Sequence, residues 1–145
     1  MQGCLILGVT LRLLVLDGSL VLRHVVERLV PADVEVESAD TFEQAYSVLC
    51  AHPPDAVIVN LGPSPLPWRE LQSCCHEHEP PIPVLFESCV FATAEEAGLD
   101  EVSGIGSFLS KPYHTDQLRS EIDRLVTLAR GSSAKSMADC THSSA

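Results

Sequence analysis

Positive charge is scarce in this sequence. Its 145 residues include nine Lys and Arg against twenty Asp and Glu, which gives a net charge of −11. The basic residues are scattered along the chain and form no cluster. Binding to a phosphate backbone requires grouped positive charge that displaces counterions. The sequence therefore predicts that nucleic acid is not a direct partner.

Long apolar runs are also missing. No uninterrupted apolar segment approaches the roughly twenty residues of a membrane-spanning helix, so we expect no membrane insertion. The apolar N-terminal stretch has neither a basic start nor a small-residue cleavage site, and Arg12 interrupts it, which is not typical of a signal peptide. The six cysteines lack the spacing of a disulfide framework. Reduced thiols in the cytoplasm are the simpler interpretation.

The remaining composition suits one folded domain. A hydrophobic content of 46% can supply a core, and the length is that of a single domain. We expect this domain to span residues 11–130, after an N-terminal extension at 1–10. Residues 131–145 are small and polar without periodicity, so they are predicted to form a disordered tail.

Five short apolar segments are typical of β-strands. The central segment, 55–62, follows two prolines and ends at a glycine. Its apolar run leads to Asn60 near the carboxyl end, as expected for a strand covered on both faces. The others lie at 11–16, 34–37, 83–87 and 107–110, and 34–37 alternates apolar and acidic residues like an edge strand.

The segments between these strands have helical periodicity. Apolar residues recur at three- and four-residue steps over 20–30, 40–51 and 67–77. After a turn at 111–113 a long helix is expected, with a predicted stop at Gly131 and an apolar stripe at Leu118, Ile122, Leu125 and Ala129. A short helix is expected at 93–97. Asp40 and Glu43 resemble a capping box for the second helix. Val126 and Leu128 lie off the main stripe of the last helix and could form a partner-facing patch. The alternation predicts an α/β fold, a three-layer sandwich with a parallel sheet.

Polar side chains stand at or just past the ends of four predicted strands. They are Asp17, Asn60, Ser88 and Lys111. In open α/β sheets the carboxyl ends of parallel strands meet at one edge, where ligands bind. We therefore expect these four side chains to converge in one shallow pocket.

Four stretches hold these residues in order: LLVLDGS at 13–19, DAVIVNLG at 55–62, PVLFESC at 83–89 and GIGSFLSKPY at 104–113. Together they resemble the receiver domain of bacterial response regulators, over about residues 11–130. The resemblance implies a flavodoxin-like, doubly wound five-stranded sheet of order 2-1-3-4-5. It also implies a role in two-component phosphorelay signalling without enzyme activity.

The chain departs from that family at two positions. In the family an aspartate after the third strand accepts a phosphoryl group, and Mg²⁺ is held by this aspartate and by an acidic pair after the first strand. Here Asn60 stands at the acceptor position and Gly18 at the second acidic position, which leaves Asp17. An amide is a poor nucleophile, and Mg²⁺ prefers several anionic oxygens. We expect no phosphorylation at Asn60, lost or weak Mg²⁺ binding, and no other cofactor.

Other parts of the family's switch are kept. Lys111 stands at the phosphate-contact position, and Ser88 and Phe108 stand at the switch positions. Without a phosphoryl group, Lys111 is expected to pair with Asp17 or Asn60. The cluster then either stabilises the loop ends or still switches. Ser88 could equally bond nearby backbone, and Phe108 could simply pack in the core.

The leading hypothesis is a pseudo-receiver, a protein-interaction module that works without phosphorylation. Its expected partner is a histidine kinase, another receiver or an output protein, and a weak homodimer through the 93–97 helix and the last helix is compatible with the pattern. The alternative is a receiver-like regulator switched by another small anion or ligand in the same pocket. A third hypothesis is zinc or copper binding by Cys74, Cys75, His76 and His78, against a polar helix end with a buried cysteine.

Overall fold

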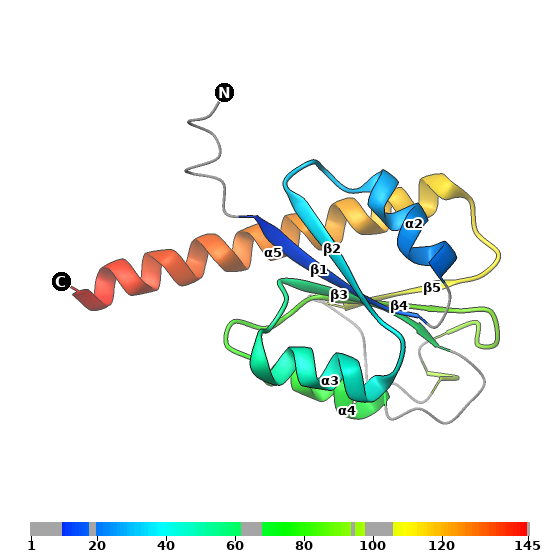
Figure 1. Cartoon of the computed structure of the whole chain (residues 1–145), viewed down its shortest axis with the longest axis horizontal. Helices are drawn as coiled ribbons and strands as arrows, with labels where there is room; N and C mark the ends of the chain where they lie inside the picture. The colour runs from blue at the N-terminus through cyan, green and yellow to red at the C-terminus, as the bar shows by residue number, and fades with distance from the viewer. Residues whose placement is uncertain (1–9, 18–19, 62–67, 94, 98–105, 145) are drawn as a thin grey trace.

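Strands and helices alternate along most of the chain. The computed structural model describes residues 10–17, 20–61, 68–93, 95–97 and 106–144 (Figure 1). The strands are β1 (Leu11–Leu16), β2 (Val34–Ala39), β3 (Ala56–Leu61), β4 (Val84–Ser88) and β5 (Gly106–Ser110). The helices are α2 (Leu20–Leu29), α3 (Phe42–Ala51), α4 (Trp68–Glu77) and α5 (Thr115–Ser144).

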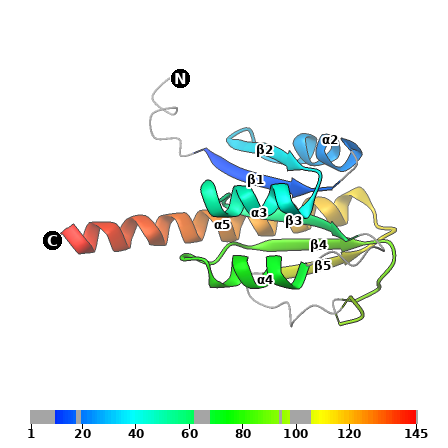
Figure 2. The ribbon, with the colours of Figure 1, turned by 60° about the horizontal axis from the view of Figure 1, so that its bottom comes forward.

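The five strands form one parallel sheet in the order β2-β1-β3-β4-β5. The predicted three-layer, doubly wound fold and its strand order are confirmed, and β2 is an edge strand as expected. Figures 1 and 2 show α2 and α5 on one face of the sheet and α3 and α4 on the other. All functional positions predicted at strand ends therefore lie at one edge of this sheet.

Each face of the sheet has its own apolar core. Alternate residues of β1, β3 and β4 pack with α3 and α4 on one face and with α2 and α5 on the other. Burial on both faces explains the continuous apolar runs of the central strands. Val126 belongs to the second core, with 6% of its surface exposed. The prediction that Val126 forms a partner-facing patch is therefore wrong, because the contact surface of α5 is wider than its main stripe.

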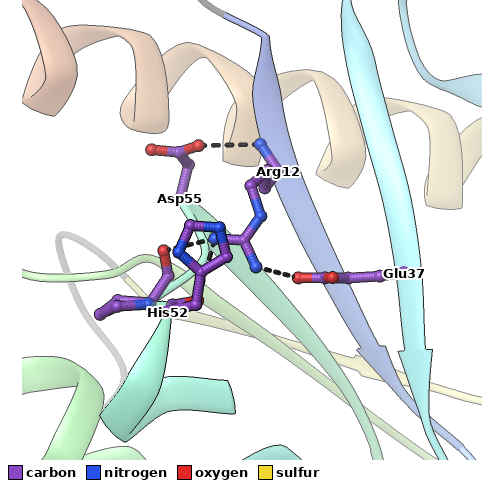
Figure 3. A network of polar contacts seen from close by, with 5 residues as sticks. Arg12, Glu37, His52 and Asp55 are labelled. Atoms are coloured by element: carbon purple, nitrogen blue, oxygen red, sulfur yellow. Dashed lines mark hydrogen bonds and ion pairs between the residues drawn. The ribbon is translucent and has the colours of Figure 1, made fainter.

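The edge of the sheet where the strands begin is held by Arg12 of β1 (Figure 3). Its guanidinium donates to the carbonyls of His52 and Pro53, both at 2.9 Å, and pairs with the Glu37 carboxylate. Its backbone N–H donates to Asp55 Oδ2 at 2.8 Å. The arginine that interrupts the first apolar run thus joins β1, β2 and the turn before β3.

The start of α3 lies one residue later than its capping pattern suggested. Thr41 is the N-cap, and its Oγ1 accepts from the backbone N–H of Gln44 at 3.2 Å. The Gln44 side chain in turn accepts from the Asp40 N–H at 2.7 Å. The prediction that Asp40 and Glu43 form the box is wrong, because Thr41 caps the helix instead. The Gln44 side chain bonds the N–H of Asp40, one residue before that cap.

The short helix predicted at 93–97 is replaced by a turn in the described residues. Thr93 Oγ1 accepts from the Glu96 N–H at 3.2 Å, and Glu96 accepts from the Ala92 N–H at 2.8 Å. These bonds resemble a helix start, yet residues 95–97 are a turn. The predicted homodimer surface was to use this helix, and the described residues do not form it.

The last helix is longer than predicted. α5 continues through Gly131 to Ser144, so the predictions of a stop at Gly131 and of a disordered tail at 131–145 are wrong for residues 131–144. This stretch contains no proline and several residues that tolerate a helix, such as Ala134, Lys135 and Ala138. Figure 1 shows the C-terminal part of α5 extending beyond the sheet. Across the described ranges, no helix has both the length and the apolar character needed to cross a membrane.

Candidate functional site

Three of the four predicted strand-end residues meet in a hydrogen-bonded chain. The Asn60 side chain, near the end of β3, donates from Nδ2 to Asp17 Oδ1 at 3.1 Å. Lys111, directly after β5, donates from Nζ to Asn60 Oδ1 at 3.0 Å. The amide thus lies between a carboxylate and an ammonium, and uses its donor for one and its acceptor for the other.

The two-residue period of the strands explains why these side chains share a face. Val15, Ile58 and Leu109 all belong to the core beneath α2 and α5. Asp17, Asn60 and Lys111 each lie two residues further along the same strands, and so reach the same face at the sheet edge. This part of the predicted convergence is confirmed by the contacts.

Ser88 does not join this chain. Ser88 lies two residues after Phe86 in β4 and therefore on the same face of the sheet, and Phe86 packs in the opposite core beneath α3 and α4. The buried Oγ of Ser88 accepts from the backbone N–H groups of Val90 at 3.0 Å and Phe91 at 2.8 Å. The expectation that Ser88 converges with the other three is therefore wrong, and its alternative role as a strand-end hydroxyl bonded to backbone is confirmed. Its neighbour Glu87 takes the place on the α2 and α5 face.

Glu87 is the residue that the sequence interpretation missed. It is fully buried in β4, and it is the register partner of Asn60 in β3. Its Oε1 accepts from the Tyr113 hydroxyl at 2.5 Å and lies 3.8 Å from Lys111 Nζ. A carboxylate inside the apolar run PVLFES was the available signal, because acidic side chains are rarely buried without a partner.

The surroundings of Glu87 change its ionisation. Burial raises its pKa, and Asp17 adds to this, while the Tyr113 hydrogen bond and the Lys111 charge act in the opposite direction. Burial and the Glu87 carboxylate also raise the pKa of Tyr113, so its hydroxyl remains a donor. The site therefore brings together the carboxyl groups of Asp17 and Glu87, the Lys111 side chain and a phenol that donates to Glu87.

A cavity of about 380 Å³ lies next to this chain of polar groups, between α2, the end of the sheet and the start of α5. Polar side chains form part of its lining and apolar side chains of the two helices form the rest: Asp17, Asn60, Lys111, Tyr113 and Thr115, with Val21, Leu22, Val25 and Leu118. The cavity can accept a small molecule or a partner's side chain with an apolar body and a polar end.

The remaining predicted positions lie outside this cluster. Gly18 falls outside the described residues. Phe108 in β5 is partly buried and packs against the core beneath α3 and α4, in register with Phe86. This packing agrees with its alternative role in the core, and its role as a switch residue stays a prediction.

The Cys and His residues in and just after α4 lie in different surroundings. Cys75 is fully buried, and burial raises its pKa to about 12, with a smaller effect of Cys74. His78 Nδ1 donates to the Pro80 carbonyl at 2.8 Å. Within the described parts of the chain, no three His, Cys, Asp or Glu side chains are grouped so that they could hold a metal ion. The metal hypothesis thus gains no support from the geometry.

No protein-family model and no curated protein matches this sequence. Solved structures do match it. The chemotaxis response regulator CheY4 of Vibrio cholerae has a TM-score of 0.64 and 19% identity, over 80% of this chain and 98% of its own. The orphan response regulator HP1043 of H. pylori has a TM-score of 0.59 and 23% identity, over 81% and 98%. A response regulator from Thermotoga maritima has a TM-score of 0.61 and 19% identity, over 82% and 99%.

The fold is that of a response regulator receiver domain. At these identities the similarity establishes the receiver fold, and the chemistry has to be argued from the residues at the sheet edge. In this receiver fold the edge carries Asn60 between Asp17 and Lys111, with Glu87 buried on the next strand.

Proposed function

We propose that this chain is a non-enzymatic receiver-like module of two-component signalling that acts through protein contacts and without phosphorylation. The observation that carries the proposal is Asn60, which stands where a phosphoryl acceptor is expected and is hydrogen-bonded to both Asp17 and Lys111. An uncharged amide does not attack phosphorus as a carboxylate does. Its donor and its acceptor are, in addition, already engaged.

The residues at the edge do not fit Mg²⁺. Asp17 Oδ1 accepts from Asn60, Asn60 Oδ1 accepts from the Lys111 ammonium, and Glu87 is fully buried with Oε1 bonded to Tyr113. Mg²⁺ requires near-octahedral oxygen ligands and keeps several waters. An ammonium at this place competes with a divalent cation. Loss of Mg²⁺ binding is therefore part of the proposal.

The proposed partner is a histidine kinase, another receiver or an output protein, because proteins of this fold are parts of two-component systems. Membrane insertion and nucleic-acid binding are not part of the proposal, and a cytoplasmic location stays a prediction. The case for a homodimer through the last helix is weakened by the burial of Val126.

A second candidate function rests on the cavity beside Lys111. A small anion or ligand with an apolar body could bind there and replace phosphorylation as the signal. Native mass spectrometry of the freshly purified protein distinguishes the two. A retained mass that is lost in a Lys111→Met variant would favour the ligand, whereas the bare chain mass favours the interaction module.

The test of the leading proposal is a titration with beryllofluoride and Mg²⁺, followed by amide chemical shifts. We expect no saturable change at Asn60 and Lys111 in the natural chain. Asn60→Asp alone should also respond weakly, because one carboxylate is still missing from the acidic pair. The Asn60→Asp, Gly18→Asp double variant is the matched positive control and should respond. Saturable shifts in the natural chain would overturn the proposal, and efficient labelling of the single variant by acetyl phosphate would refute the stated order.

A further inference from the structure

Two side chains that follow β5 hold the same buried oxygen atom. Glu87 Oε1 accepts from the Tyr113 hydroxyl at 2.5 Å and lies 3.8 Å from Lys111 Nζ. Lys111 and Tyr113 flank Pro112 in the turn that leads from β5 to α5. The Lys111 backbone N–H also donates to the Ser88 carbonyl at 2.7 Å. The exit of β5 is thus joined to the end of β4 by three contacts, two of which end on Glu87.

We propose that Glu87 is a positioning residue that supplies, from inside the sheet, the negative charge that Asn60 lacks, and so holds Lys111 and the turn after β5 in one arrangement. The proposal assigns a role to a residue that neither the strand-end pattern nor the fold similarity singled out. It concerns groups of this chain alone, so it holds whether or not a partner protein reads the surface.

The geometry places the charge where Lys111 can use it. Asn60 and Glu87 are register partners on β3 and β4, and the Lys111 ammonium approaches Asn60 Oδ1 at 3.0 Å as well as Glu87 Oε1. Asn60 contributes a dipole and no charge. The Lys111 side chain keeps 29% of its surface exposed, whereas Glu87 is fully buried. A carboxylate in such surroundings interacts with a nearby ammonium more strongly than an exposed one does.

Tyr113 adds a hydrogen bond of defined direction to the contact between Glu87 and the turn after β5. An ionised carboxylate only accepts hydrogen bonds, and the phenol supplies a donor from the turn itself. Among the described residues, the second oxygen of Glu87, Oε2, has no hydrogen-bond partner. The polar contacts of the Glu87 side chain are therefore made by Oε1, and both groups that approach Oε1 belong to the turn after β5.

The position of this turn shapes the adjacent cavity. Lys111, Tyr113, Thr115 and Leu118 all line it, and the first two are those that approach Glu87. Release of Glu87 would free the turn and change the cavity wall and the first turn of α5. Glu87 would thus set the shape of the site through Lys111 and Tyr113 and without lining it.

The experiment compares Glu87→Gln, Tyr113→Phe and the double variant, with Glu37→Gln as the matched control. Glu37 is a carboxylate bonded to a cation elsewhere in the sheet, at Arg12. Amide hydrogen exchange of residues 111–118 should accelerate about tenfold in each single variant, since Glu87→Gln removes the charge from the acceptor and Tyr113→Phe removes the donor. The double variant should change little beyond the larger single effect, because both substitutions abolish the same charge-assisted hydrogen bond. Glu37→Gln should leave this segment unchanged.

A second measurement separates positioning from general stability. The side-chain resonances of Lys111 should show a pH-dependent step that follows Glu87 and disappears in Glu87→Gln. Exchange at 111–118 that matches the natural chain, additive effects in the double variant, or a Lys111 pH profile that is the same in the natural chain and in Glu87→Gln would each overturn the proposal, since a step caused by Asp17 would be present in both proteins. If Glu87→Gln does not fold, Tyr113→Phe decides, because it retains the carboxylate. The beryllofluoride titration tests the proposed function separately, since its result does not depend on these variants.

Discussion

Glu87 couples ionisation to folding, because a buried carboxylate has to lose its hydration when it is charged. Its pKa is raised by burial, and Asp17 raises it further, against the opposing effects of Tyr113 and Lys111. A folded-state pKa above the unfolded value means that the folded protein binds the Glu87 proton more tightly than the unfolded chain does. This contribution to stability is complete below the unfolded pKa and is lost as the pH rises through the higher folded pKa.

We therefore expect the natural chain to lose unfolding free energy relative to Glu87→Gln as the pH rises above the ordinary glutamate range. The slope is at most about 1.4 kcal/mol per pH unit for one proton. Urea unfolding of both proteins over a pH series measures the difference. Asp17, Lys111 and Tyr113 face Glu87, and their presence in both proteins cancels much of their own effect. A difference that is independent of pH, or that grows in favour of the natural chain, would contradict the prediction.

Arg12 is the second residue whose role depends on its partners. It donates to two backbone carbonyls and pairs with Glu37, and 16% of its side chain is exposed. We expect Arg12→Met to lower the unfolding free energy by about 1.5–3 kcal/mol, because hydrogen bonds from a charged group to two backbone carbonyls and to the Glu37 carboxylate are lost.

Arg23→Met is the matched control for Arg12. Arg23 pairs with Glu27 on the surface of α2 and donates from Nη1 to Ser38 Oγ at 3.1 Å, and 37% of its side chain is exposed. An exposed pair contributes little, so the expected loss is below about 1 kcal/mol. Denaturant unfolding of both variants gives the comparison. Equal losses of unfolding free energy in the two variants would show that the Arg12 contacts contribute no more to stability than an exposed ion pair does.

At the scale of elements, local pattern predicted most boundaries and failed where two patterns competed. β1 spans the predicted residues, and α2 and α4 differ from prediction by one residue at an end. The capping box moved by one position because Thr41 with Gln44 competes with Asp40 and Glu43. Gly131 did not end α5, because a glycine weakens a helix without forbidding it.

Gly131 gives a direct test of the extended α5. A Cβ added at this position meets nothing within 4 Å, so alanine introduces no clash. Alanine is about 1 kcal/mol more favourable than glycine inside a helix. We expect Gly131→Ala to slow amide exchange in residues 131–144 about fivefold. Gly131→Pro, the opposing control, should abolish protection there. Exchange that is the same in all three proteins would contradict the helix beyond residue 131.

At the scale of the whole molecule, the charge of −11 is the dominant electrostatic property. It should repel a phosphate backbone at any orientation, because no cluster of basic residues offsets it. We expect no binding of a labelled DNA duplex in fluorescence anisotropy, even at a low salt concentration of about 50 mM. Binding that weakens steeply with added salt would contradict this prediction. A basic DNA-binding protein serves as the positive control.

The class of fold, and the strands that end in polar residues, could be predicted from the order of the amino acids. Apolar periodicity is a local property, so the buried strands, the helices between them and the positions of Asp17, Asn60 and Lys111 could be predicted from neighbouring residues. The strand order came from the resemblance to a known family, and the structure confirmed it.

The contacts between side chains could be identified only from the folded chain. Contacts across the sheet depend on register, which relates residues far apart in the chain. Register brought Glu87 beside Asn60, and alternation sent Ser88 to the opposite face. Packing of α5 against the sheet buried Val126. The carboxylate that completes the site was therefore visible in the sequence only as an acidic residue in an apolar strand, and its partners Lys111 and Tyr113 were set by the fold.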